Sequence, residues 1–438
     1  MSPPTAAGGV SPARLCAFTV IRRVFERGAY ADRALAAEAA DLGPRDRALA
    51  TRLAYGTIQR RATLDHVAGI LVGRRLEDLD PPVLAALRLG LFQILLLAGI
   101  ADHAAVNESV ELAKNARGGG YKLVNAVLRR ATREGAAILD RLGDENPARA
   151  ATLHSVPEWL ARLWWAELGP GPARALLARI NDPAESALRV NTLVATPEEV
   201  LASLPVPARR VAGLPEALIL EAPFDTFASP LWNAGAIMPQ SRASMAVGRV
   251  LAPEPGSRVL DLCAAPGAKT THLAALMGGA GEVIAVERNP ARAESLRQTS
   301  ARMRADRVLV EEADGALPRV DGQFDCVLVD PPCSGLGTLQ SRPDIRWRSS
   351  PRSVATLAGI QKVILAAGAA ATAPGGVLVY SVCTISQAES EGVVGAMLVE
   401  HPEFALEQRV ALMPHVDGTD GFFIARLRRS GTTLRHRP

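Results

Sequence analysis

The sequence predicts a protein of three domains: an all-α N-terminal domain, a small α+β module, and a C-terminal α/β domain with a Rossmann-like, doubly wound parallel sheet. Three observations predict this class. The chain has 438 residues, whereas a single domain has roughly 150. Apolar residues recur at helical spacing before residue 135, and apolar strands alternate with helices after residue 234.

The N-terminal domain is assigned to residues 1–142. Phe18, Ile21 and Phe25 follow the spacing of three and four residues that places side chains on one face of a helix. The most apolar run of the chain, residues 83–98, is interrupted by two polar side chains. Because a membrane span needs about 20 apolar residues, we expect a buried helix there and no association with a membrane.

The remaining chain divides into two parts. A polar stretch bounded by proline, residues 143–157, is expected to be a linker, and we assign residues 143–233 to the α+β module. Within it, residues 186–191 and 217–221 alternate apolar and polar side chains in the manner of short strands. The α/β domain is assigned to residues 234–438, where strands and helices alternate.

Composition and charge limit the functional classes. With 48% hydrophobic and 21% charged residues, the chain resembles a globular protein rather than a disordered or collagen-like one. The net charge is +4, and residues 1–150 alone carry +5. This excess is a weak indication of a polyanionic partner such as nucleic acid, and a solvated basic surface is the commoner explanation. Five cysteines without a CxxC or zinc pattern favour a reducing compartment, the cytoplasm, and no metal site.

A tight turn of small residues, 263–269, lies between an apolar strand and the start of a helix. It matches neither the phosphate-binding P-loop nor the dinucleotide GxGxxG pattern, so a ligand with a carboxylate fits it better. The next strand ends at Glu287, where α/β proteins place an acceptor for ribose hydroxyls, and Asp314 follows the third strand. Together these residues predict S-adenosyl-L-methionine as cofactor; the alternative is a purely structural turn.

Two cysteines follow neighbouring strands of the predicted sheet. Cys333 comes after Asp330 and two prolines, at the end of the fourth strand, and Cys383 ends the fifth. Beside a methyl donor, two thiols favour covalent catalysis on a pyrimidine. A thiolate that adds to carbon 6 makes carbon 5 nucleophilic enough to take a methyl group. The spacing leaves open which thiol attacks. The other three cysteines are expected to be small buried hydrophobes.

Seven motifs in order resemble the Sun-type RNA cytosine-5 methyltransferases, whose branch acting on small-subunit ribosomal RNA carries an N-terminal domain similar to the antitermination factor NusB. The resemblance covers almost the whole chain. The motifs occupy residues 46–56, 124–130, 263–269, 330–334, 343–347, 380–383 and 420–423.

The resemblance implies a NusB-like helical domain, an RNA-binding α+β module and a class I S-adenosylmethionine-dependent methyltransferase domain. It implies that Cys383 is the nucleophile, that Cys333 helps to expel the methylated product, and that Asp330 lines both cofactor and base. It also implies a set of cofactor-binding residues: Cys263, Ala264, Ala265, Pro266, Gly267, Ala268, Lys269, Glu287, Asp314 and Asp330.

The substrate implied by the resemblance is a cytosine in 16S ribosomal RNA, methylated at carbon 5 by a monomeric cytoplasmic enzyme. Two alternatives stay open. The same strand-end residues would serve a transfer RNA cytosine-5 methyltransferase. A non-enzymatic RNA-binding or antitermination protein, built on the helical domain with an inactive catalytic half, is the other alternative.

Overall fold

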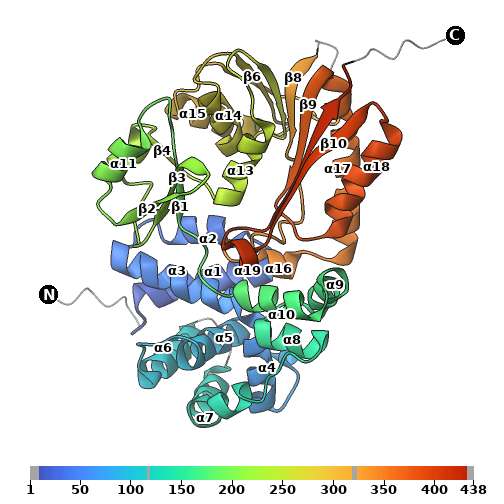
Figure 1. Ribbon diagram of the computed structural model, residues 1–438. Helices are drawn as coiled ribbons and strands as arrows, with labels where there is room; N and C mark the ends of the chain where they lie inside the picture. The colour runs from blue at the N-terminus through green and yellow to red at the C-terminus, as the bar shows by residue number, and fades with distance from the viewer. Residues whose placement is uncertain (1–8, 116–118, 318–322, 432–438) are drawn as a thin grey trace. The chain divides into compact units, whose positions relative to one another are not determined.

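The computed structural model describes residues 9–115, 119–317 and 323–431 (Figure 1). The chain forms two compact units. The first comprises residues 1–182 and 339–349, and the second comprises residues 183–338 and 350–438. A segment of the C-terminal half is therefore part of the N-terminal unit.

The first unit is helical in the part of the chain that is described. Several of its helices begin at a proline. The fixed φ of proline suits the first turn of a helix, and because N–H groups in that turn have no acceptor within the helix, proline costs no hydrogen bond there. Its elements are α1 (Pro12–Arg27), α2 (Ala31–Glu38), α3 (Pro44–Gln59), α4 (Arg61–Val72), η1 (Leu76–Asp78), α5 (Pro81–Leu95), α6 (Asp102–Asn115), α7 (Tyr121–Leu139), α8 (Pro147–His154), α9 (Glu158–Leu168), α10 (Pro170–Arg179) and α16 (Ile345–Arg348).

The predicted buried helix is confirmed as α5. Its apolar side chains are enclosed by the other helices of the first unit, and its two polar interruptions have partners. Arg88 forms an ion pair with Asp65 at 2.7 Å, and Gln93 accepts a hydrogen bond from Arg14 at 2.6 Å. Because these groups are paired, the helix can be buried on nearly all sides.

The second unit contains both sheets. Its elements are β1 (Ala187–Val190), α11 (Pro197–Ser203), β2 (Ala208–Val211), β3 (Leu214–Leu220), α12 (Pro230–Asn233), β4 (Ile237–Pro239), α13 (Arg242–Leu251), β5 (Arg258–Leu262), α14 (Ala268–Leu276), β6 (Glu282–Val286), α15 (Pro290–Arg302), β7 (Val308–Glu311), β8 (Phe324–Val329), α17 (Pro351–Ala371), β9 (Thr372–Val382), η2 (Gln387–Glu389), α18 (Glu391–Glu400), β10 (Phe404–Leu412), α19 (Pro414–Asp417) and β11 (Phe422–Arg429).

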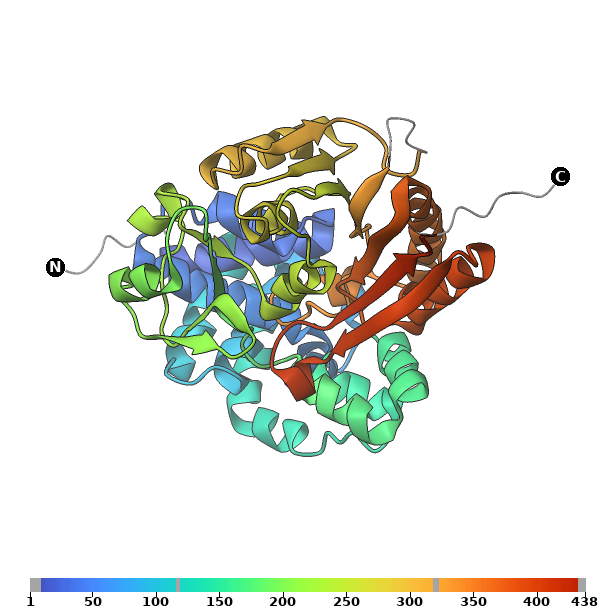
Figure 2. The ribbon, with the colours of Figure 1, turned by 45° about the horizontal axis from the view of Figure 1, so that its top comes forward.

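Four strands form the sheet of the α+β module, in the order β2-β3-β1-β4 with antiparallel neighbours. Seven strands form the larger sheet, in the order β10-β11-β9-β8-β5-β6-β7 (Figures 1 and 2). The five strands from β9 to β7 are parallel, as the predicted α/β fold requires. The predicted fold class is confirmed.

An antiparallel pair at one edge of this sheet was not predicted. β11 pairs with β9, and β10 pairs with β11, both antiparallel. Most side chains of β10 are exposed, so this strand lacks the alternation of apolar and polar residues by which a half-buried strand is recognised in a sequence. The sheet is thus mixed, with a parallel centre.

The strands of the parallel centre are buried on both faces. In β5, Val259 packs into the cluster with α13 and α14, whereas Leu260 and Leu262 pack into the cluster with α17 and α18. By length and composition alone, α17 could cross a membrane. However, half of its most apolar 18-residue stretch is buried inside the protein, and the helix packs against β8 and β9. It is a core helix of the α/β domain.

The two units do not follow the three predicted domain ranges. Helices α8–α10 belong to the first unit because α8 packs against α4, and β1–β4 belong to the second because β3 packs against α13. The boundaries after residues 142 and 233 stay predictions.

Candidate active site

Two thiols meet at the carboxyl edge of the parallel sheet. β8 and β9 are parallel neighbours in the sheet (Figure 1). Cys333 follows β8, and Cys383 follows β9. Their Sγ atoms are 3.2 Å apart, within hydrogen-bonding distance; neither cysteine is in a disulfide, and both residues are partly exposed. Because parallel strands end at the same edge, β8 and β9 bring together residues that lie 50 positions apart in the chain.

The protonation of Cys333 depends on its partner. The hydrogen bond with Cys383 raises the pKa of the Cys333 thiol well above its usual value, and burial raises it further. The negative charges of Cys383, Glu389 and Asp330 act in the same direction. Since a thiolate forms only when a thiol loses its proton, the surroundings of Cys333 favour its neutral form.

The other three cysteines stay protonated. Burial raises the pKa of Cys16 and Cys326 to about 11 and that of Cys263 to about 12. Since the thiolate is the reactive form of cysteine, these groups are poor nucleophiles at neutral pH. Cys16 and Cys326 are buried in apolar clusters, as expected for small hydrophobes.

Lys269 and Asp330 form an ion pair at the same edge. Lys269 Nζ lies 2.7 Å from Asp330 Oδ2, and the Ser381 hydroxyl donates to Asp330 Oδ1 at 2.9 Å. Burial lowers the pKa of Lys269, but the charges of Asp330, Cys383 and Asp261 raise it by more, so that its net pKa lies above the usual value. A permanent ammonium group therefore stands near Asp330 and Cys383.

The predicted cofactor loop has backbone conformations that few residues adopt. Cys263 has φ +67° and Gly267 has φ +104°. A Cβ atom at position 267 would lie 2.7 Å from Leu296 Cδ1, so a side chain there would meet both strain and a clash. Gly267 precedes α14, which begins at Ala268, as the strand-turn-helix pattern predicts.

The two acids predicted to hold a nucleoside lie at the ends of β6 and β7. Glu287 is 5% exposed, accepts a hydrogen bond from the Asn289 backbone at 2.8 Å, and lies 3.3 Å from Arg292. Asp314 is more open; its Oδ1 accepts from the backbone of Ala316 at 3.0 Å. Both are acceptor groups at the edge that also carries the cofactor loop.

Two buried groups support the cofactor loop and were not predicted. Asp261, in β5, accepts a hydrogen bond from Thr270 Oγ1 at 2.7 Å, and burial raises its pKa to about 7. Arg189, in β1, is fully buried; it donates to the Ala268 carbonyl and, at 2.8 Å, to Thr271 Oγ1. The α+β module thus holds the first turn of α14. A buried acid before the loop was the available sequence signal for Asp261, whereas nothing local marked Arg189.

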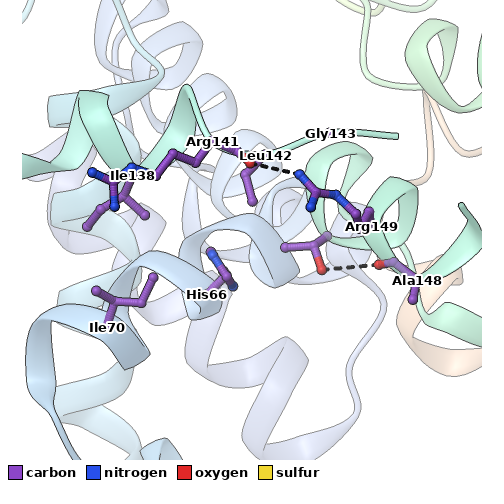
Figure 3. A pocket seen from close by; sticks show the side chains of 9 residues that line it. His66, Ile70, Ile138, Arg141, Leu142, Gly143, Ala148 and Arg149 are labelled. Carbon is purple, nitrogen blue, oxygen red and sulfur yellow. Dashed lines mark hydrogen bonds between the residues drawn. The ribbon is translucent and has the colours of Figure 1, made fainter. Parts of the chain in front are cut away.

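A cavity of about 330 Å³ lies elsewhere, in the first unit between α4, α7 and α8 (Figure 3). Ile70, Ile138 and Leu142 give it an apolar lining, and His66 and two arginines stand around it. One of these, Arg149, donates to the Arg141 carbonyl at 3.0 Å. The chemistry expected of a methyl-transfer site is carried by the second unit, not by this cavity.

Three protein families match successive parts of the chain. Residues 248–428 match the family described as 16S rRNA methyltransferase RsmB/F. Residues 11–133 match the NusB family, and residues 156–226 match the ferredoxin-like domain of RsmF/B-like methyltransferases. The three matches follow the order of the expected NusB-like, α+β and methyltransferase parts.

Individual relatives cover nearly the full length. A probable ribosomal RNA small subunit methyltransferase B of Synechocystis is 35% identical over 95% of this chain and 99% of its own. The ribosomal RNA small subunit methyltransferase B of Thermus thermophilus is 37% identical over 88% of this chain and 89% of its own. The crystal structure of PH0851 has a TM-score of 0.80 and 27% identity, covering 98% of this chain and 100% of that one. This chain belongs to the 16S rRNA methyltransferase RsmB/F family.

Proposed function

We propose that this protein methylates carbon 5 of a cytosine in 16S ribosomal RNA through a covalent bond between Cys383 and carbon 6 of the base. The observation that carries the proposal is the pair of partly exposed thiols, 3.2 Å apart, at the edge of the sheet that holds the cofactor loop. Two thiols suit a reaction that makes and then breaks a bond between sulfur and the base. Direct attack on the methyl group by an amine of the base would need no thiol.

In this mechanism the Cys383 thiolate forms a bond from Sγ to carbon 6, and the electron pair of the broken double bond moves to carbon 5. Carbon 5 would then take the methyl group of a bound donor, whose bond to the sulfonium sulfur would break and leave a neutral thioether. Once carbon 5 loses its proton, the carbon–sulfur bond breaks, which restores the double bond and the thiolate. Cys333 assists this last step as the second thiol of the pair. The role of each thiol follows the resemblance to Sun-type enzymes.

S-adenosylmethionine, when bound, supplies an electrophilic methyl group. The donor set of the site fits this ligand. The strained loop Cys263–Lys269 leads into the start of α14, where a carboxylate is favoured by the helix dipole. Glu287 and Asp314 offer carboxylates for hydroxyl and amino groups of a nucleoside. Asp330 forms an ion pair with Lys269 of the loop and accepts a hydrogen bond from Ser381, two residues before Cys383.

The RNA must present its target base unstacked, as in a loop or a flipped nucleotide. Lys122, Arg129 and Arg133 on α7 are exposed and suited to phosphate contacts, which position RNA without reading its sequence. The named function of the relatives favours small-subunit ribosomal RNA as the substrate and the cytoplasm as the location.

Bisulfite sequencing of ribosomal and transfer RNA, from cells with and without the gene, tests the proposed substrate. We expect one 16S cytosine to lose its methyl group in the deletion strain, and a plasmid copy to restore it. Loss confined to a transfer RNA would assign the same chemistry to another substrate. Unchanged methylation in both RNA classes would contradict the proposal.

A further inference from the structure

Strand β1 of the α+β module has an apolar face and a polar face. Leu188 and Val190 pack into the apolar cluster of the module itself. Because side chains alternate between the two faces of a strand, Arg189 and Asn191, which follows β1 directly, lie on the other face. Both are fully buried. Arg189 contacts the start of α14 and Asn191 contacts the end of α15, so the polar face connects the module to two helices of the larger sheet.

Arg189 holds the end of the cofactor loop through two nitrogens of its guanidinium. Nη1 donates to the Ala268 carbonyl at 2.5 Å, and Nη2 donates to Thr271 Oγ1 at 2.8 Å. The Thr271 hydroxyl in turn donates to the Gly267 carbonyl at 2.8 Å. Since the N–H groups of a guanidinium have a fixed fork geometry, these contacts fix both the distance and the orientation of residues 267–271.

The cofactor loop is a segment that needs support from its surroundings. Cys263 has φ +67°, a conformation that residues with a side chain rarely adopt and that persists only where the neighbouring structure holds it. Arg292, in α15, supports the middle of the loop by donating to the Ala265 carbonyl at 2.7 Å. Arg189 supports the end of the loop, and it does so from a different sheet.

Arg189 is a costly residue to bury. Its side chain has no exposed surface, its Nε has no hydrogen-bond partner, and no carboxylate of the described residues forms an ion pair with it. The carboxylate of Glu216, whose charge acts on Arg189, is bound by Arg249 and His272 instead. A buried charge without an ion-pair partner lowers stability unless hydrogen bonds compensate it. The hydrogen bonds that Arg189 makes go to the first turn of α14, which indicates a role at the loop.

We propose that Arg189 is a positioning residue for S-adenosylmethionine: from the α+β module, it holds residues 267–271 in the conformation that binds the methyl donor. The inference rests on the proposed placement of the donor in this loop. Arg189 is not a catalytic residue, because it is buried and acts through Gly267, Ala268 and Thr271. The module then has a role besides the RNA binding that the resemblance implies, since the affinity for the methyl donor depends on it.

The test removes the guanidinium and measures both donor binding and loop order. Arg189→Met keeps a long side chain in the buried position, and thermal unfolding shows whether the variant is folded. Isothermal titration calorimetry without RNA gives the Kd for S-adenosylmethionine. If the loop is in its binding conformation about one tenth of the time, the apparent Kd rises about tenfold, which is the result we expect. Hydrogen–deuterium exchange in peptides covering residues 264–271 should be faster in the free variant.

Asn191→Ala is the matched control. Asn191 donates from Nδ2 to the Gly235 carbonyl at 2.9 Å and to the Met303 carbonyl at 2.7 Å, and neither acceptor belongs to the loop. This variant loses a buried contact of the same face of the module without losing one at the loop. Its Kd for S-adenosylmethionine should equal that of the wild-type protein. A rise as large as in Arg189→Met would assign the effect to general loss of packing and would overturn the proposal.

Thr271→Val decides the question if Arg189→Met does not fold. It removes the hydroxyl that links Arg189 to Gly267 and leaves the guanidinium in place, so the Kd should again rise. A wild-type Kd in folded Arg189→Met, or in folded Thr271→Val where that variant decides, overturns the proposal and leaves the proposed function standing. Wild-type protein that binds S-adenosylmethionine but methylates no RNA removes the proposed function and leaves this inference standing, so the two failures are distinguishable.

Discussion

The Sγ atoms of Cys333 and Cys383 lie 3.2 Å apart, although the two residues come from the ends of different strands. At this distance one thiol can donate a hydrogen bond to the other. A bond between either sulfur and a substrate therefore changes the electrostatic surroundings of its partner directly. The two side chains act as one unit, and substitutions at the two positions should have different consequences.

Replacing each cysteine separates their roles. Cys383→Ala should abolish methyl transfer, because it removes the nucleophile. Cys333→Ala should accumulate a covalent protein–RNA adduct, because the second thiol no longer assists release. Denaturing gel electrophoresis with labelled RNA detects the adduct as a band of reduced mobility. An adduct in Cys383→Ala and none in Cys333→Ala would mean that the roles are reversed.

Removing the charge of Lys269 should slow the reaction strongly. In Lys269→Met, Asp330 loses the ammonium group 2.7 Å away, and the thiolate at Cys383 loses a neighbouring positive charge. We expect kcat/KM to fall by about a hundredfold, as when one preorganised electrostatic contact is removed. Lys114→Met is the control, because Lys114 pairs with Glu111 on the helical surface. Equal activity in the two variants would contradict this account.

His272 should make stability depend on pH. Burial lowers its pKa to about 4, from 6.5, although a hydrogen bond to Glu216 at 2.8 Å opposes this. Between pH 6.5 and 4 the unfolded chain binds a proton at this site that the folded chain does not. The free energy of unfolding should therefore fall as the pH falls, by at most about 1.4 kcal/mol per pH unit from this group.

Glu216 adds to the same trend. The pKa of Glu216 is below its usual value because its bonds to His272 and Arg249 outweigh burial, so its contribution is lost as the pH falls through the acidic range. Urea unfolding at several pH values measures how the free energy of unfolding changes with pH. His272→Gln should make the free energy of unfolding depend less on pH between pH 6.5 and 4. A slope unaffected by His272→Gln would refute the assignment.

Arg346 should be essential for the stability of the first unit. It is fully buried, and its guanidinium donates to Ser155 and Leu339 carbonyls and to Asn181 Oδ1 at 3.0 to 3.1 Å. Arg346→Met leaves these acceptors buried without a donor, at a cost of about 3 kcal/mol or more. Thermal unfolding should show a lower Tm. Arg348→Ala, at the exposed position nearby, should change Tm little, and equal effects would contradict the prediction.

The sequence predicted the parts of the protein that depend on local patterns. Strand ends, the Gly267 turn and the cysteines after β8 and β9 follow from short motifs and from the rule that parallel strands end at one edge. Because that rule places whole strand ends together, Cys333 and Cys383 could be expected to meet before any coordinates were known.

The residues that were missed depend on contacts distant in sequence. Arg346 was noted only as part of a motif, and its partner Ser155 lies 191 positions away. Glu389 is an ordinary glutamate in a polar stretch, and it becomes a buried acceptor only because η2, α17 and β9 converge on it. No spacing in the sequence distinguishes such a residue from a solvated one.

The central claim is most directly tested by methyl transfer to undermethylated 16S RNA. The purified protein is incubated with this RNA and with S-adenosylmethionine labelled in its methyl group, and the RNA is digested to nucleosides. We predict that the label appears in 5-methylcytidine with the wild-type protein and disappears with Cys383→Ala. Label in a different nucleoside, or undiminished label with Cys383→Ala, would contradict the account.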